Sequence, residues 1–288
     1  MKINDIDLES IIRLVTERTG IIPRASHRDG IKTYVEKVLS ERSFGVAKYL
    51  SALSADRVLF SELVNESTVN ETYFFREEKQ FSLLKERFFP LWKSMFGSAE
   101  MKIWSAACSF GEEPYSLALL ADFCGVNVKI IASDINSEVL SHCKNGVFLS
   151  SSLRQVDGLH FKHLIEPYIR KDRMIEFSPS IKNMIETRQI NLSMIDSPLV
   201  DFMLPKNQNI IFLRNVFIYF SQELRARILR TIAQKCLCDG GILFVSMSEI
   251  AQLDSSVMPS SFEKVMDGSV FYFHKKEGEV KVYGKNLG

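Results

Sequence analysis

The chain contains 288 residues, of which 46% are hydrophobic and 25% charged, the composition of an ordinary soluble globular protein. Its 36 basic and 35 acidic residues give a formal net charge of +1, which argues against a strongly electrostatic footprint on nucleic acid. We expect a cytoplasmic protein, because no apolar run approaches the roughly 18 residues of a membrane span, no apolar leader is present, and five cysteines lack framework spacing.

The first part of the chain, residues 1–65, predicts an all-helical N-terminal domain. Apolar residues recur at helical spacing over 6–15 and again over 31–39. Gly20 is one of the residues that break the first helix. We therefore predict a second domain that covers residues 66–288.

From about residue 100 the pattern alternates between strands and helices. Strands are expected at 101–107, 128–133, 209–213 and 241–247, and helices at 114–124, 136–145 and 221–238. This alternation predicts an α/β fold with a doubly wound, largely parallel sheet. Near the end, two strand-like runs flank Asp267-Gly268, which is a hairpin signal. A terminal antiparallel hairpin on such a sheet is typical of the class I methyltransferase variant of the Rossmann-like fold.

The segment over about 147–190 interrupts this alternation. Residues 173–177 and 184–190 look like short strands, with prolines and charges between them. We interpret the segment as a small inserted antiparallel β-subdomain that lies outside the main sheet.

The most informative stretch of the sequence is Ile103–Leu120, where an apolar strand runs through small residues into a helix near Pro114. Such a turn lets backbone N–H groups and a helix N-terminus approach a ligand closely. Asp134 ends the next apolar strand about 20 residues further on, the usual distance for a carboxylate that binds a ribose. Together they predict a nucleoside-bearing cofactor at the carboxyl ends of a parallel sheet.

Six sequence blocks, in order along nearly the whole chain, resemble the chemotaxis receptor methyltransferases, the CheR family. They are N-E-T-Y-F-F-R-E (70–77), W-S-A-A-C-S-F-G-E-E-P-Y-S (104–116), A-S-D-I (132–135), N-L (191–192), I-F-L-R-N-V-F-I-Y-F (211–220) and S-E (248–249). The resemblance implies a protein-glutamate O-methyltransferase that uses S-adenosylmethionine, releases S-adenosylhomocysteine and acts on the cytoplasmic helices of methyl-accepting chemoreceptors. We expect a monomer, with no nucleic-acid partner and no membrane insertion.

The family's functional positions fall on intact residues here. By resemblance, Arg76 lies near the methionine carboxylate, Glu113 suits the methionine ammonium, and Asp134 binds the ribose. Tyr219 matches a tyrosine beside the transferred methyl group, so Arg76 and Tyr219 are the candidate catalytic residues. The candidate cofactor-binding residues are Asn70, Thr72, Arg76, Glu113, Asp134, Asn191, Leu192, Arg214 and Asn215.

These residues suit methyl transfer to a carboxylate. A glutamate has a reference pKa of about 4.3, so it is ionised at neutral pH and needs no general base. Catalysis then comes mostly from alignment, which can supply roughly 7–11 kcal/mol. None of the five histidines falls in one of the six blocks. Arg76 and Arg214 could each hold a carboxylate bidentately, and Tyr219 could either donate a hydrogen bond or pack against the methyl group.

Several alternatives stay open at this point. The protein could be a signalling module that binds the cofactor without transferring methyl, because the basic residues of the second helix, such as Arg28 and Lys32, are interleaved with acids. It could also methylate small molecules or nucleic acid, although no N-P-P-Y type motif is present. A dehydrogenase is disfavoured because the loop lacks G-x-G-x-x-G. Cys236-x-Cys238 and His160-x-x-His163 lack a second ligand pair, so we expect no metal site.

Overall fold

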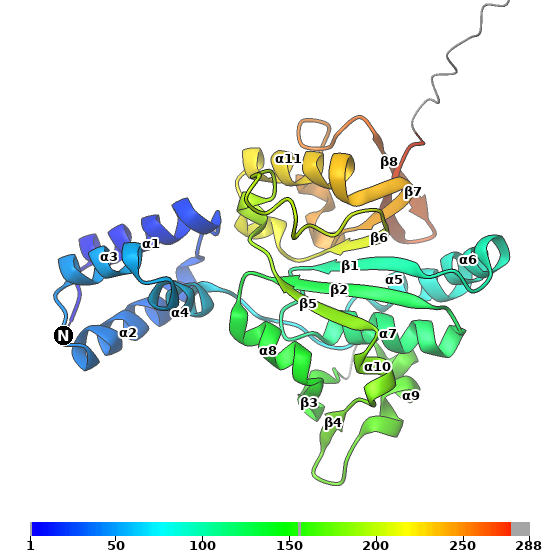
Figure 1. Ribbon diagram of the computed structural model, residues 1–288, viewed down its shortest axis with the longest axis horizontal. Coiled ribbons are helices and arrows are strands. Elements are labelled where there is room, and N and C mark those ends of the chain that lie inside the picture. The colour runs from blue at the N-terminus through cyan, green and yellow to red at the C-terminus, as the bar shows by residue number, and fades with distance from the viewer. Residues whose placement is uncertain (1, 155–156, 278–288) are drawn as a thin grey trace, which may run out of the picture.

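The computed structural model describes residues 2–154 and 157–277, so the last 11 residues of the predicted second domain and two residues of the insert lie outside the described part. The chain begins with four helices, α1 (Asp5–Thr19), α2 (Ala25–Glu41), α3 (Val46–Ala55) and α4 (Arg57–Ser67). They pack around their own apolar core and lie beside the rest of the molecule (Figure 1). The helical character is as predicted, and it extends to Ser67, two residues beyond the predicted boundary.

The main body is built on a seven-stranded sheet with the order β5-β2-β1-β6-β7-β9-β8. Its strands are β1 (Met101–Ala106), β2 (Val128–Asp134), β5 (Ile185–Gln189), β6 (Gln208–Leu213), β7 (Leu237–Phe244), β8 (Phe262–Asp267) and β9 (Val270–Lys275). The first five in this order pair in parallel, and β9 and β8 add antiparallel. This confirms the predicted doubly wound sheet with a terminal hairpin.

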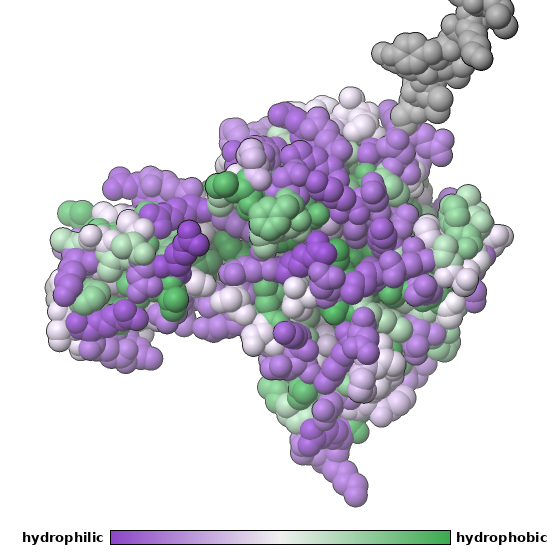
Figure 2. Space-filling view, viewed as in Figure 1, coloured by the Kyte–Doolittle hydropathy of each residue, from purple (hydrophilic) through white to green (hydrophobic). Residues whose placement is uncertain are grey.

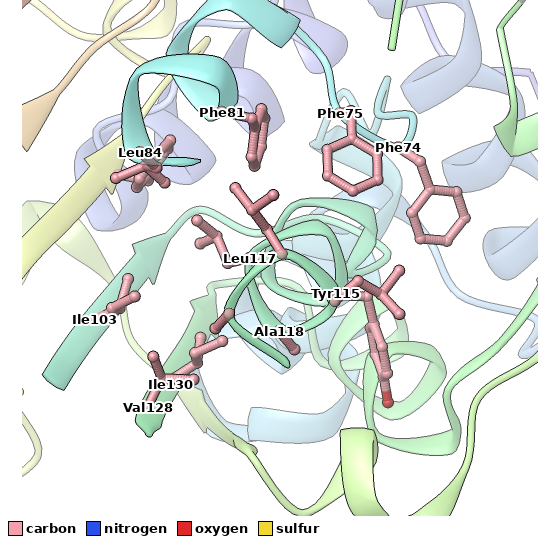
Figure 3. Packing of buried hydrophobic residues seen from close by; sticks show 14 of the residues in the cluster. Phe74, Phe75, Phe81, Leu84, Ile103, Tyr115, Leu117, Ala118, Val128 and Ile130 are labelled. Carbon is pink, nitrogen blue, oxygen red and sulfur yellow. The ribbon is translucent and has the colours of Figure 1, made fainter. Parts of the chain in front are cut away.

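Helices cover both faces of this sheet. Helices α7 (Glu112–Cys124) and α8 (Ser137–Asn145) lie on one face, and α11 (Gln222–Thr231) lies on the other (Figure 1). Figure 3 shows α7 between the strand residues Ile103 and Ile130 and the rings of Phe75 and Phe81. Because it is covered on more than one side, α7 is buried along most of its length, which explains the apolar run L-A-L-L-A over 117–121.

Two further helices were not expected from the sequence. These are α5 (Glu78–Leu83) and α6 (Phe89–Phe96), joined by a π-helical turn over 84–88. Glu77, which precedes α5, has a left-handed backbone and provides no side-chain cap, so the usual sequence signal for a helix start is missing. A second π turn extends α11 over 232–236. Short 3₁₀ turns lie at 150–152, 159–161, 166–168, 192–194, 217–219 and 247–252.

The insert is smaller than predicted. Strand β3 (Val147–Leu149) pairs antiparallel with β4 (Met174–Glu176), next to the short helices α9 (Lys162–Ile165) and α10 (Pro179–Lys182). The prediction that residues 184–190 belong to the insert is wrong, because β5 pairs in parallel with β2 and forms an edge of the main sheet. Its polar sequence, I-E-T-R-Q, is that of an exposed edge strand, which periodicity alone does not distinguish from a surface hairpin.

Local boundaries also differ from those predicted. In the terminal hairpin Asp267 pairs with Val270, so the two turn residues are Gly268 and Ser269 rather than Asp267 and Gly268. Gly268 has a φ of 57°, which suits glycine in a tight hairpin turn. Helix α7 starts at Glu112, two residues before Pro114.

The visible surface mixes polar and apolar residues (Figure 2). An apolar area at its edge coincides with α6, where Leu91, Met95 and Phe96 are exposed. Within residues 2–154 and 157–277 we find no helix with the length and apolar character needed to cross a bilayer.

Candidate functional site

A pocket opens at the carboxyl ends of β1, β2 and β6, and all ten residues predicted for the site line it. The lining comes from the end of α1, the segment 68–76, the loop after β1, the ends of β2, β5 and β6, and the turn that follows β6. The sequence-predicted lining residues are Asn70, Thr72, Arg76, Glu113, Asp134, Asn191, Leu192, Arg214, Asn215 and Tyr219. The structure therefore brings together residues up to 149 positions apart in the sequence (219 − 70).

The loop between β1 and α7 has the backbone expected of a ligand-binding turn. Ala107, Ser109 and Gly111 have φ values of 58°, 51° and 107°. A Cβ atom on Gly111 would lie 2.6 Å from the Cys143 sulfur, so the close packing of this loop on α8 requires glycine there. The Ser109 hydroxyl is buried and has no hydrogen-bond partner in the described part of the protein. It is therefore a polar group available to a ligand.

Asp134 joins the end of β2 to this loop. Its Oδ2 accepts a hydrogen bond from Ser109 N at 2.9 Å, and its Oδ1 accepts one from Asn136 N at 3.0 Å. Burial raises the pKa of Asp134, and these backbone donors oppose the increase. Asp134 is not the N-cap of the following helix α8, because that position belongs to Asn136, whose side chain accepts from Glu138 N and Val139 N. Asp134 thus lines the pocket with acceptor capacity left for a ligand hydroxyl.

Arg214 and Glu113 form a largely buried ion pair in the wall of the pocket. Arg214 is 5% exposed, and its Nε donates to Glu113 Oε2 at 2.7 Å. Its Nη1 donates to the Arg76 carbonyl at 2.7 Å and to Gln80 Oε1 at 3.1 Å. Because Nε and Nη1 are already bonded within the protein, Arg214 does not have the free fork that bidentate binding of a ligand carboxylate needs. Glu113 is also held by Ser105 Oγ, at 2.6 Å from its Oε1.

Tyr219 lies in the pocket wall, next to the guanidinium group of Arg24. The Arg24 guanidinium lies 5.3 Å from its ring centroid, and Ile22 N donates to the Tyr219 carbonyl at 3.0 Å. Arg76 lines the pocket and donates to the Glu71 carbonyl at 2.7 Å. Burial raises the pKa of Tyr219; the charges of Arg24 and Arg76 oppose that increase, and the carboxylates of Glu249 and Glu71 add to it. The phenol is therefore neutral at physiological pH and can donate a hydrogen bond.

Of the remaining predicted residues, some form an apolar wall of the pocket and others hold neighbouring segments in place. Leu192 is a buried apolar wall. Asn191 uses its side chain elsewhere: Nδ2 donates to the Arg18 carbonyl at 2.9 Å, and Oδ1 accepts from Ser193 N at 2.9 Å. It therefore fastens the end of α1 to the pocket. Asn70 Nδ2 donates to Thr68 Oγ1 at 3.1 Å.

Three residues at the site carried no predicted role. Gln80 is fully buried and bridges Arg214 to the Val245 carbonyl, which its Nε2 reaches at 2.8 Å. Glu77 accepts from Met247 N at 3.2 Å. Glu249 is fully buried and accepts from Asn215 N at 2.7 Å and from Ile218 N at 3.3 Å. The only sequence signal was that Glu77 and Glu249 fall within blocks of the family resemblance.

Backbone strain is concentrated around this pocket. Eight non-glycine residues in the described ranges have positive φ, and five of them, Phe75, Glu77, Ala107, Ser109 and Asn215, lie in its three main loops. Such conformations persist only where the surroundings enforce them. The pocket is thus built in advance by the fold.

These residues fit an adenosyl cofactor. The pocket offers apolar walls at Ile135, Ile190 and Leu192, an acid at the end of β2, and polar groups toward Arg76 and Asn215. With the sheet order β5-β2-β1-β6-β7-β9-β8, they define a class I methyltransferase that uses S-adenosylmethionine. Within the described ranges, no group of three or more His, Cys, Asp or Glu side chains is arranged to hold a metal ion.

The chain belongs to the CheR methyltransferase family. Residues 70–265 match the family model described as "CheR methyltransferase, SAM binding domain". A chemotaxis protein methyltransferase of Salmonella typhimurium is 30% identical over 259 residues, which cover 86% of this chain and 85% of that protein. One from Borreliella burgdorferi is 28% identical over 275 residues, covering 90% and 94%. The solved rRNA methyltransferase aviRa of Streptomyces viridochromogenes has a TM-score of 0.40 and 14% identity, covering 73% of this chain and 87% of that one.

Proposed function

We propose that this methyltransferase esterifies glutamate side chains on the cytoplasmic helices of chemoreceptors. The relatives named as chemotaxis protein methyltransferases support the kind of partner. The observation that carries the acceptor chemistry is the position of Tyr219, which lines the pocket and has the Arg24 guanidinium 5.3 Å from its ring centroid. A neutral phenol beside a positively charged guanidinium attracts and orients an anionic acceptor.

None of the carboxylates among the described lining residues of the pocket is without a hydrogen-bond partner in the protein, which disfavours a dedicated general base. The pocket holds three carboxylates, and each is already engaged: Glu71 with Arg154 Nη2 at 3.1 Å, Glu113 with Arg214, and Asp134 with backbone N–H groups. Cys108 also lines the pocket, but its hydrogen bond with the Cys143 thiol, together with burial, holds the pKa of its own thiol well above the ordinary value. An amine or hydroxyl acceptor would need a base, whereas a glutamate is already ionised at neutral pH.

We assign the chain's residues to positioning roles on this basis. When bound, S-adenosylmethionine supplies an electrophilic methyl group on a sulfonium. Asp134 accepts hydrogen bonds from the ribose, and Arg76 holds the methionine carboxylate. Tyr219 orients the incoming glutamate carboxylate. Glu113 and Asp134 offset the positive charge that the arginines and the sulfonium bring together.

Other assigned cofactor contacts come from around the rim. Asn70, Thr72, Leu192 and Asn215 line the pocket and would contact the cofactor, while Arg214 and Asn191 would contribute mainly by fixing the loops that surround it. We further propose that the enzyme works as a monomer in the cytoplasm.

A second candidate is a cofactor-binding signalling module with little or no transfer activity. The observation that favours it is the pairing, within the helical region, of basic residues on α2 and at its C-terminal cap. Arg28 pairs with Glu9, Lys32 Nζ lies 3.5 Å from Asp5 Oδ1, and Arg42 Nη2 lies 3.9 Å from Glu62 Oε2. These internal ion pairs reduce the positive charge that α2 offers to an acidic receptor bundle.

A labelled-methyl assay separates the two candidates. The full chain is incubated with methyl-labelled cofactor and with cytoplasmic receptor fragments, and label released as volatile methanol by mild base is counted. We expect base-labile label with the parent and with Glu263→Gln, an exposed acidic control on β8, and much less with Tyr219→Phe. A parent that binds S-adenosylhomocysteine but labels no fragment supports the module instead.

A further inference from the structure

Glu249 is an acidic residue that neither the cofactor contacts nor the acceptor chemistry uses. It lies in the 3₁₀ turn Met247–Gln252 after β7 and has no exposed surface. Both carboxylate oxygens accept backbone N–H groups from the turn after β6: Oε2 from Asn215 at 2.7 Å and Oε1 from Ile218 at 3.3 Å. No ion pair within 4.0 Å reaches it from the described part of the chain.

A buried carboxylate without a cationic partner is costly to the fold. Its desolvation raises the pKa of Glu249, as expected for a charge removed from water. An apolar residue would fill the same space at lower cost. The carboxylate therefore matters for the hydrogen bonds that its two oxygens accept. The donors of both bonds lie in one segment of backbone.

That segment carries two residues of the pocket. Asn215 has a φ of 57°, a conformation that a non-glycine residue holds only with outside support. The 3₁₀ turn Phe217–Tyr219 follows directly, with Phe217 fully buried. Asn215 and Tyr219 both line the pocket, whereas Glu249 does not. The Glu249 carboxylate thus bonds to the backbone at Asn215 and at Ile218. The Tyr219 side chain extends from the turn that these two bonds hold.

We propose that Glu249 is a positioning residue for methyl transfer, which fixes the turn 215–219 and thereby sets where Tyr219 meets the acceptor. The inference rests on the proposed role of Tyr219. It goes beyond that role because it makes the placement of the phenol depend on a buried side chain 30 residues further along the chain (249 − 219). A purely structural Glu249 would affect stability without changing the efficiency of the folded enzyme.

The test compares Glu249→Gln with the exposed control Glu263→Gln in the full chain. Glutamine has nearly the same shape, but it keeps only one acceptor oxygen and turns an NH₂ toward the second backbone donor. We expect kcat with receptor fragments to fall by roughly 10- to 100-fold, because small displacements of a positioned group are costly to rate. The dissociation constant for S-adenosylhomocysteine should change by less than about threefold, since the residues that hold the cofactor elsewhere in the pocket are unchanged.

A readout in the free protein makes the test independent of turnover. Backbone amide protons that donate to a carboxylate are held in strong, charge-assisted bonds. In Glu249→Gln, the amide resonances of Asn215 and Ile218 should move upfield and exchange faster with solvent, while those of β1 stay unchanged. The control Glu263→Gln should leave all of them in place.

The outcomes separate this inference from the proposed function. An inactive parent contradicts the proposed function and with it the role of Glu249 in methyl transfer, and the amide measurement then tests whether Glu249 fixes the turn 215–219. A folded Glu249→Gln with parental kcat and unshifted amides overturns the inference. If Glu249→Gln does not fold, Glu249→Asp decides: its carboxylate is one methylene shorter, so a folded variant with reduced kcat supports the inference, and parental kcat overturns it.

Discussion

Arg214 Nε and Glu113 Oε2 lie 2.7 Å apart in the protein interior, although 101 residues separate them in the sequence. The pair connects the end of β6 to the first turn of α7, and the same guanidinium holds the Arg76 carbonyl. Three segments of the cofactor pocket are thus locked together in its wall. The Arg214–Glu113 ion pair therefore contributes to function by holding these loops in a fixed geometry.

Breaking this ion pair from one side should destabilise the protein strongly. Arg214→Met leaves Glu113 buried without its cation, and we expect a loss of about 3–5 kcal/mol in the free energy of unfolding. The double variant Arg214→Met/Glu113→Gln should recover part of that loss, because no lone charge then remains. Urea denaturation measures all three proteins, and losses that simply add would contradict a direct interaction.

Asp134→Ala should weaken binding of S-adenosylhomocysteine by about 1–3 kcal/mol, since charged hydrogen bonds to the ribose would be lost. Titration calorimetry measures the affinity directly. Glu138→Gln, at an exposed acidic residue four positions along the chain, serves as the control and should bind normally. Equal affinities for all three proteins would refute the assignment of Asp134 to the ribose.

Acidification should weaken cofactor binding through the same carboxylate. Burial raises the pKa of Asp134, so it becomes protonated at a pH where an exposed aspartate is still ionised. Because the native state then binds more protons than the unfolded state, this group's contribution to stability increases as pH falls through that window. Binding should respond in the opposite direction: affinity for S-adenosylhomocysteine declines on acidification from about pH 7 toward pH 4. The decline should flatten in Asp134→Asn, and an unchanged slope in that variant would rule Asp134 out as its source.

Tyr219→Phe should reduce turnover more than cofactor affinity. It removes only the phenol oxygen, so packing against Arg24 and the covalent path of the turn are kept. We expect kcat to fall by roughly 10-fold or more with an almost unchanged affinity for S-adenosylhomocysteine. Comparable losses in both quantities would argue against a role in orienting the acceptor.

Arg24 provides a separate test of acceptor recognition. The exposed guanidinium above the Tyr219 ring should attract acidic receptor segments, so Arg24→Gln should raise KM for the fragment by roughly threefold at low salt. The difference should shrink as salt screens the charge. Arg57→Gln, at an exposed arginine that begins α4, is the matched control. A KM effect that is independent of salt would contradict an electrostatic role.

The sequence predicted the sheet and the general location of the pocket well, because both follow from local patterns. Strands that alternate with helices must form a parallel sheet, and residues at the carboxyl ends of such strands meet at one edge. Asp134 and Tyr219 line the pocket for this reason.

The parts that were missed depend on long-range partners. Nothing near Gln80 in the sequence indicates that it will bond to Arg214, 134 residues away. The sequence also predicts that Arg214 binds the ligand. In the structure its guanidinium instead donates hydrogen bonds to residues from two other segments, which the sequence does not reveal. The strand β5 was assigned to the insert because its polar pattern suits either environment, and only its pairing with β2 decides between them.

The most direct test of the central claim is peptide mapping by mass spectrometry of receptor fragments treated with the enzyme and S-adenosylmethionine. We predict a single added methyl group on specific glutamates, absent after mild base, absent when those glutamates are replaced by alanine, and strongly reduced with Tyr219→Phe. Methylation on lysine, histidine or hydroxyl side chains, or its persistence after base treatment, would contradict the account.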